Sequence, residues 1–405
     1  MVYVRNGRAA LIDRPLRLTL LTEIPAPYRV PIFNALAERP EIELDVIFLR
    51  NRNPKRPYEI RTEEFRFGWR TLPGFHVARG SHWLVANAGT VGALRRARPD
   101  VVVVGGWNQP AFWQALTFAR VARRVSVGWI ESTSRDARPG ILLFETMKRA
   151  FVRACDGHIV PGAAAGDYVR SLGVPAERIA VAPNAVDTRL FGALPSRDRA
   201  RAELGVSGVC LLCVGRLDRE KGVDLAIRAL ALLPPEVTLT VIGAGPEREE
   251  LERLAGREAY GRVRFAGFLP QARVAEWYAA ADAVVLPSRS EQWGMVLNEA
   301  AAASLPIVAS DAAGAAHELV EPGGNGFRFP SDDLPALEAA LRRLVEDSGF
   351  RRLAALRSKE LSRRFEPEAW AESVARLASD LVRLASADGV AGLDPANGAE
   401  WRRRR

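Results

Sequence analysis

Two glutamates eight positions apart are the first side chains whose spacing could do chemistry. Glu291 lies in a loop after an apolar strand, and Glu299 lies about one and a half turns inside a helix predicted to begin near Met295. At this separation the two carboxylates can serve different parts of one extended ligand. They are poorly placed to act as a general acid and base on a single bond.

The start of that predicted helix favours an anion. Gly294 allows the backbone to turn sharply into the helix, and the first N–H groups of a helix have no partner within it. The helix dipole adds partial positive charge at the same end. The loop before Met295 is therefore predicted to hold a phosphate or diphosphate.

A second loop in the same half of the chain supplies positive charge. Arg216 and Lys221 lie between a strand ending at Val214 and a helix beginning at Val223, so both can converge on a phosphate. Only 4 of the 57 basic residues are lysine. A compact ammonium in a narrow site would explain a lysine here, and a solvated loop lysine is the alternative.

Two further loops follow predicted strands of this half. Gly243 and Gly245 form a turn whose missing side chains let backbone approach a ligand. Phe268 and Leu269 could wall a flat nucleobase, with core packing as the competing interpretation.

In the first half, the candidate residues also follow predicted strands. In an open α/β sheet, ligands bind beyond the carboxyl ends of the strands. The loop with Pro27, Tyr28 and Arg29 has that position, as do the loop with Trp107 and the strand end at Glu131. Glu131 could equally be a helix cap or an ordinary loop carboxylate. A short strand is also expected near Phe65 and Phe67.

Length and charge limit the architecture and the partners. The 405 residues suit two domains of roughly 150–200 residues each. Residues 1–195 hold 28 Lys+Arg and 17 Asp+Glu, a net of +11, whereas residues 196–405 have a net of −2. A basic first half suggests an anionic surface such as membrane headgroups or a phosphorylated lipid, although a general bias toward arginine explains it equally well. Without interleaved aromatic and basic residues, nucleic-acid binding is not expected.

Compartment and metal content are predicted from cysteines and apolar runs. Three cysteines cannot form a disulfide framework, and Cys210 and Cys213 lie in an apolar strand rather than a metal site. No segment reaches the ~18 apolar residues of a membrane span, and residues 1–8 lack the apolar core of a secretory signal. A cytoplasmic location is therefore expected, with peripheral contact at the inner membrane face as an option.

Five separated segments together resemble retaining glycosyltransferases of the two-Rossmann (GT-B) fold, group 1, family 4. The resemblance is close over residues 180–330 and looser in the first half, where it includes 25–29 and the strand end at Glu131. The five segments are Pro183–Asp187, Val214–Gly222, Ile242–Pro246, Phe268–Pro270 and Glu291–Ala300.

The resemblance implies an α/β fold of two Rossmann-like domains facing across a cleft. Residues 14–190 would bind the acceptor, 191–365 would bind the donor, the helix 366–386 would cross back to the first domain, and 387–405 would be a disordered basic tail. It implies transfer of a hexose from a nucleotide-diphosphate sugar to a sugar or lipid-linked acceptor in cell-surface polysaccharide or glycolipid synthesis. No metal or cofactor would be needed.

The resemblance also assigns roles to residues. Arg216 and Lys221 would bind the diphosphate, Glu299 the ribose hydroxyls, and Glu291 would lie near the sugar ring. Many relatives have histidine where this chain has Glu131, which is expected on the acceptor side. Other expected donor contacts are Gly215, Gly243, Gly245, Phe268, Leu269, Trp293, Gly294, Met295 and Val296. Expected acceptor contacts are Pro27, Tyr28, Arg29 and Trp107.

Other functions remain compatible with the motifs. A nucleotide-sugar epimerase or an α-glucan phosphorylase has a similar fold, but a phosphorylase needs a cofactor-linking lysine, and Lys359 lies outside the motif loops. A non-catalytic nucleotide-binding module is the non-enzyme alternative.

Overall fold

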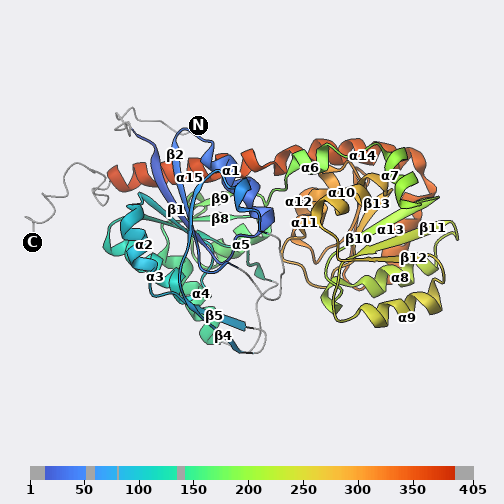
Figure 1. The fold of residues 1–405 in the computed structure, drawn as a ribbon, viewed down its shortest axis with the longest axis horizontal. Helices are drawn as coiled ribbons and strands as arrows, with labels where there is room; N and C mark the ends of the chain where they lie inside the picture. The colour runs from blue at the N-terminus through green and yellow to red at the C-terminus, as the bar shows by residue number, and fades with distance from the viewer. Residues whose placement is uncertain (1–13, 52–59, 80–81, 135–141, 388–405) are drawn as a thin grey trace, which may run out of the picture. The chain divides into compact units, whose positions relative to one another are not determined.

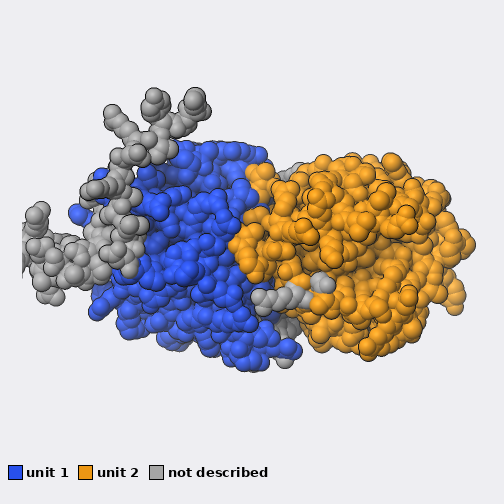
Figure 2. Space-filling view, turned by 90° about the horizontal axis from the view of Figure 1, so that it is seen from above, with its two compact units in different colours: residues 1–161, 165–182, 370–405 blue, residues 162–164, 183–369 orange. Residues whose placement is uncertain are grey.

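The computed structural model describes residues 14–51, 60–79, 82–134 and 142–387 (Figure 1). The chain forms two compact units (Figure 2). Unit 1 comprises residues 1–161, 165–182 and 370–405, and unit 2 comprises 162–164 and 183–369. Each unit is a parallel sheet flanked by helices, as the predicted fold class requires.

Unit 1 is built on a seven-stranded parallel sheet with the order β3-β2-β1-β6-β7-β8-β9. The register places Leu18 of β1 opposite Leu44 of β2 and Val101 of β6. A separate antiparallel hairpin pairs β4 (Phe75–Arg79) with β5 (His82–Ala86). The sheet strands are β1 (Leu16–Thr22), β2 (Ile42–Phe48), β3 (Gly68–Thr71), β6 (Val101–Val104), β7 (Val125–Trp129), β8 (Gly157–Val160) and β9 (Ile179–Val181).

Helices cover the sheet of unit 1 because most of its central strands are apolar on both sides, as in Val101–Val104. Phe112 and Leu116 of α3 and Phe151 of α4 belong to one buried cluster with Leu21 of β1. The helices are α1 (Val30–Ala37), α2 (Thr90–Ala97), α3 (Pro110–Val121), α4 (Leu142–Ala154), α5 (Ala163–Ser171) and α15 (Pro367–Ala387).

The last helix, α15, packs in unit 1 although the preceding residues belong to unit 2. The ring of Trp370 lies 6.2 Å from that of Phe33 in α1 and 5.3 Å from that of Trp129 in β7. Further along, a side chain at Gly157 would meet Leu381 at 2.5 Å, so the helix lies directly on β8. The chain therefore returns to its first unit, as the resemblance implies.

Unit 2 has a six-stranded parallel sheet with the order β12-β11-β10-β13-β14-β15. Consecutive residues of β10 belong to different buried clusters. Leu212 packs in a cluster with residues of α10 and α11, and Leu211 packs in a second cluster with residues of α8 and α13. The strands are β10 (Val209–Val214), β11 (Val237–Ile242), β12 (Val263–Gly267), β13 (Ala283–Leu286), β14 (Ile307–Ser310) and β15 (Gly326–Phe329). The helices are α6 (Thr188–Gly192), α7 (Arg197–Leu204), α8 (Val223–Ala231), α9 (Arg248–Glu258), α10 (Gln271–Ala280), α11 (Met295–Ala302), α12 (Gly314–Leu319), α13 (Leu334–Glu346) and α14 (Ser348–Ser362).

Strand order reverses once in each sheet. In unit 1 the chain moves outward from β1 on one side and from β6 on the other, and in unit 2 from β10 and β13. Loops at the carboxyl ends of two such strands diverge and leave a crevice for ligands. In unit 2 these two loops contain Arg216 with Lys221 and Glu291 with Gly294.

The structure corrects several predicted boundaries. Unit 2 begins at Pro183 rather than 191, because the Asn184 carbonyl accepts a hydrogen bond from Asn298 and Val186 is buried in the unit 2 core. The short strand expected near Phe65 and Phe67 is β3, at 68–71, and those two rings stack at 5.0 Å just before it. The predicted tail beyond residue 387 lies outside the described residues. Within the described ranges, no helix is long and apolar enough to cross a bilayer.

Candidate functional site

Lys221 and Glu291 meet at the point of unit 2 where strand order reverses. Lys221 ends a 3-10 turn, η5 (Arg219–Lys221), after β10, and its ammonium forms an ion pair with Glu291 in the loop after β13. Their side chains are only 19% and 16% exposed. Gly222 lets the two loops approach: it has φ +65°, and a side chain there would lie 2.1 Å from the Pro287 carbonyl oxygen.

Arg216 lies in the same loop as Lys221 but is more open. Its guanidinium contacts Asp218 at 2.8 Å, and its side chain is 60% exposed. Gly215 lies beside the lysine stem, because a Cβ at this position would be 3.8 Å from Lys221 Cδ. The structure therefore brings both predicted cations to one loop, where each is paired with a carboxylate.

Gly243 and Gly245 face backbone of this same loop. Gly243 has φ +146°, and a side chain on it would lie 1.7 Å from the Gly215 carbonyl oxygen. One on Gly245 would lie 2.2 Å from the Leu217 carbonyl oxygen. The glycines thus allow the loops after β10 and β11 to pack together, and their contact with a ligand stays a prediction.

The start of α11 completes the edge of the site. Gly294, with φ +98°, is its N-cap and offers no capping side chain, and a Cβ on it would be 3.4 Å from Glu291 Cγ. Met295 and Val296 are half-buried against the unit 2 core. The positive end of the helix therefore lies beside Glu291, and binding of an anion there stays a prediction.

Trp293 is a core residue in the structure, which corrects its prediction as a donor contact. Its side chain is 6% exposed, and its indole N–H donates to Asn298 Oδ1 at 2.8 Å. The Asn298 amide in turn donates to the Asn184 carbonyl oxygen at 2.8 Å. The indole therefore supports the loop from within, because its polar edge and its faces are already used.

Glu299 is paired with Tyr278, a tyrosine that no sequence motif marks. The hydroxyl of Tyr278, a fully buried residue of α10, donates to Glu299 Oε2 at 2.6 Å. Burial raises the pKa of Glu299 to about 7, although the Tyr278 hydrogen bond opposes the rise. This carboxylate can therefore change charge near neutral pH.

Binding of a nucleotide sugar should depend on this titration. The resemblance implies that Glu299 binds the ribose hydroxyls. If it does, its ionisation between about pH 6 and about pH 8 makes it a stronger acceptor for them, so the donor Kd should fall several-fold. A nucleotide sugar is the right ligand for this measurement because its diphosphate diester does not change charge in this pH range, so a change in Kd reports on the protein. Glu299→Gln should make the donor Kd independent of pH over this range. Tyr278→Phe should move the change in Kd to higher pH, because it removes the hydrogen bond that lowers the pKa of Glu299. The same dependence of donor Kd on pH in the wild type and in Glu299→Gln would contradict this role.

Phe268 and Leu269, the predicted wall for a base, differ in environment. Phe268 is 64% exposed, whereas Leu269 is half-buried against the unit 2 core. Of the two, Phe268 is the one whose side chain is mostly exposed to solvent.

In unit 1, Arg29 and Glu131 form a charged cluster at the carboxyl edge of the sheet, after β1 and β7 respectively. Arg29 Nη2 donates to both carboxylate oxygens of Glu131 at 3.1 and 3.2 Å, and Nη1 donates to Thr22 Oγ1 at 2.9 Å. The guanidinium also lies 4.3 Å from the ring centroid of Trp129. Glu131 is thus an ion-pair partner of Arg29, with 32% of its side chain exposed.

The other predicted acceptor residues lie on the neighbouring loops. Pro27 and Tyr28 form the 3-10 turn η1 with Arg29 directly after β1. The carbonyl of Trp107 accepts a hydrogen bond from the Trp113 indole at 2.8 Å. Lys148 lies 5.6 Å from the Trp107 ring centroid and donates to Tyr168 at 3.0 Å. Lysine scarcity, the signal that marked Lys221, would also have marked Lys148.

Comparisons with known proteins agree with the fold and motifs. The sequence model of the family described as "Glycosyl transferases group 1" matches residues 197–363, and that of "Glycosyltransferase Family 4" matches 33–190. D-inositol 3-phosphate glycosyltransferase 1 of Catenulispora acidiphila is 30% identical over 402 residues, which cover 93% of this chain and 88% of that enzyme. The D-inositol 3-phosphate glycosyltransferase of Xylanimonas cellulosilytica is 35% identical over 225 residues, so this match spans about half of each chain, 53%.

A solved structure shows the same fold. The crystal structure of Anabaena Alr3699/HepE in complex with UDP has a TM-score of 0.72 and 23% identity. The match covers 90% of this chain and 99% of that one. At this level of identity the likeness bears on architecture alone.

Proposed function

Because the chain belongs to the group 1, family 4 glycosyltransferases, we propose that it transfers a hexose from a nucleotide-diphosphate sugar, with retained configuration, to a sugar or lipid-linked acceptor. The enzyme class predicted from the sequence, a hexosyltransferase, is confirmed by the named relatives. The donor, the acceptor and the stereochemistry belong to the proposal.

The observation that carries the proposal is the Lys221–Glu291 pair beside the start of α11. It places an ammonium, a carboxylate and a helix N-terminus at the carboxyl edge of one sheet, where strand order reverses. The ammonium and the helix N-terminus can bind a diphosphate, and a sugar hydroxyl can donate to the carboxylate.

The proposed reaction exchanges one bond at the anomeric carbon. The bond between this carbon and the β-phosphate oxygen breaks, its electron pair stays on the phosphate, and the acceptor hydroxyl oxygen bonds to the same face of the carbon. The acceptor proton passes to the departing phosphate, so no strong protein base is needed. Lys221 and Arg216 neutralise the charge that grows on the diphosphate.

In this proposal Glu299 accepts hydrogen bonds from the ribose hydroxyls, and Phe268 lies beside the base. Arg29, Glu131, Tyr28 and Trp107 contact the acceptor. The charge of Glu131 is balanced by Arg29, which leaves carboxylate oxygens available for acceptor hydroxyls. We place the reaction in cell-surface polysaccharide or glycolipid synthesis, with the basic first half near anionic lipid.

UDP-sugars are the first donors to test, because the Anabaena protein was crystallised with UDP and with UDP-glucose. The purified protein is incubated with UDP-, GDP- and ADP-hexoses, with and without a mixture of sugar and lipid-linked acceptors. We expect release of one nucleoside diphosphate, stimulated by acceptor, and a product with the anomeric configuration of the donor by NMR. Inversion would refute retention, and no turnover of any donor would refute the proposed activity.

A further inference from the structure

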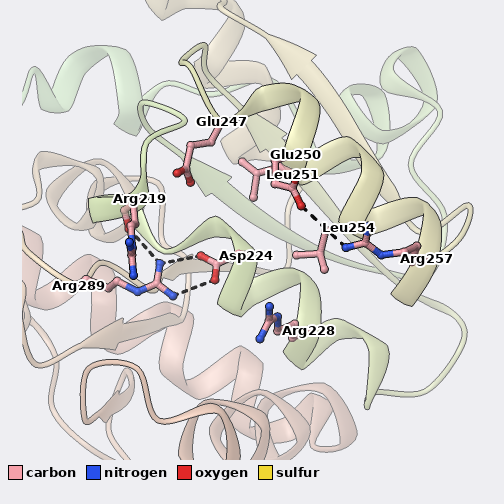
Figure 3. Close-up of a pocket in the computed structure, with 9 residues that line it drawn as sticks. All are labelled: Arg219, Asp224, Arg228, Glu247, Glu250, Leu251, Leu254, Arg257 and Arg289. Carbon is pink, nitrogen blue, oxygen red and sulfur yellow. Dashed lines mark hydrogen bonds and ion pairs between the residues drawn. The ribbon is translucent and has the colours of Figure 1, made fainter.

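Arg289 joins the two loops that form the proposed donor site. It lies two residues before Glu291, and its Nη1 donates to the Arg219 carbonyl oxygen at 3.0 Å (Figure 3). Nη1 and Nη2 also donate to the two carboxylate oxygens of Asp224, at 2.7 and 2.8 Å. One planar guanidinium thus binds both the turn η5 and the first turn of α8.

The backbone of the same loop strengthens this connection. The N–H groups of Arg289 and Ser290 both donate to the Glu220 carbonyl oxygen, at 2.7 and 3.3 Å. The loop after β13 therefore binds the turn Arg219–Lys221 through the successive carbonyls of Arg219 and Glu220. Lys221, the last residue of this turn, forms its ion pair with Glu291 of the same loop.

The environment favours a persistent pair between Arg289 and Asp224. Their side chains are 23% and 25% exposed, and the geometry is bidentate. Burial opposes ionisation of Asp224, yet the hydrogen bonds and charge of Arg289 lower its pKa below the usual value. The Arg289 Nε also donates to Asp332 at 2.6 Å, so the guanidinium has little freedom to rotate.

We propose that Arg289 is a positioning residue for donor binding: it fixes the turn η5 so that the Lys221 ammonium faces the diphosphate. This inference rests on the proposed function of Lys221. It does not require Arg289 to touch the donor. A lysine could not replace it fully, because an ammonium cannot bind a carboxylate through a planar fork and a carbonyl at once.

A matched control lines the same cavity, which has a volume of about 310 Å³. Arg228 of α8 is one of its lining residues, and within the described ranges no hydrogen bond joins its side chain to the turn η5 (Figure 3). Arg228→Gln removes the same charge as Arg289→Gln from the same cavity. It should leave donor binding unchanged.

The test measures binding of UDP, GDP and ADP by calorimetry and continues with the nucleotide that binds the wild type most tightly. Arg289→Gln should weaken its affinity about tenfold, and Arg289→Lys should weaken it less. Melting temperatures of the variants show whether each one is folded. Equal affinities for Arg289→Gln and Arg228→Gln would overturn the inference.

A double-mutant cycle separates this inference from the proposed function. If Arg289 acts through Lys221, adding Arg289→Gln to Lys221→Ala should change affinity less than about twofold. Full additivity would overturn the positioning role and leave the function intact. No effect of Lys221→Ala itself, or no binding of any nucleotide by the wild type, would refute the proposed function.

Discussion

Replacing Lys221 by alanine is expected to lower kcat for sugar transfer about 10²–10³-fold, with a smaller rise in the donor KM. In the proposed reaction the ammonium meets a diphosphate whose negative charge increases as the sugar bond breaks, so the interaction is stronger in the transition state than with bound donor. Initial rates of transfer and of donor hydrolysis measure both constants.

Lys359→Ala is the matched control, because Lys359 is an exposed lysine on α14, outside every site loop. Its rates should equal those of the wild type. Lys221→Ala also leaves Glu291 without its ion-pair partner, so its melting temperature is compared in parallel. A folded Lys221→Ala protein with wild-type kcat would show that the departing charge is neutralised elsewhere.

The two parallel sheets could be predicted because their strands are short apolar runs that alternate with helical segments. Val101–Val104 and Val209–Val214 are of this kind, and the structure places both inside a sheet. The β4–β5 hairpin was missed, because its strands pair with each other and not with either main sheet. The start of unit 2 at Pro183 was also missed, since it depends on contacts with α11 such as Asn298–Asn184.

Residues of the proposed donor loops could be found in the sequence because local chemistry marks them. Arg216, Lys221 and Glu291 follow strand ends, and strand order alone brings the loops of β10 and β13 together. The residues that pair with these and other charged side chains could not be predicted from strand order. Arg29 pairs with Glu131 102 positions away, and Tyr278 looks like an ordinary core aromatic until α10 is packed against α11.

Trp293 shows the opposite error. An aromatic residue next to a glycine in a site loop suggests a ligand contact, but this indole is buried and bonded to Asn298. Spacing along the chain could not reveal it, because the side of the loop that faces the core is decided by α14 and the turn after it, where Phe365 packs on Trp293 at 6.3 Å.

Trp370→Ala is expected to lower the free energy of unfolding of unit 1 by about 3–5 kcal/mol. Trp370 is fully buried, and its ring contacts both Phe33 and Trp129. Removing the indole leaves a cavity that rigid strands and helices fill only in part. Urea unfolding followed by circular dichroism measures the loss without relying on tryptophan fluorescence.

The same helix provides the control for this substitution. Leu384→Ala, at a position that is 57% exposed, should change the free energy of unfolding by less than about 0.5 kcal/mol. Trp370→Phe should fall between the two, because it keeps an aromatic ring. If Trp370→Ala is no less stable than Leu384→Ala, α15 does not contribute to the core of unit 1. A large loss would mean that the returning helix supports Trp129, and through it the Arg29 guanidinium that lies on that ring at the proposed acceptor site.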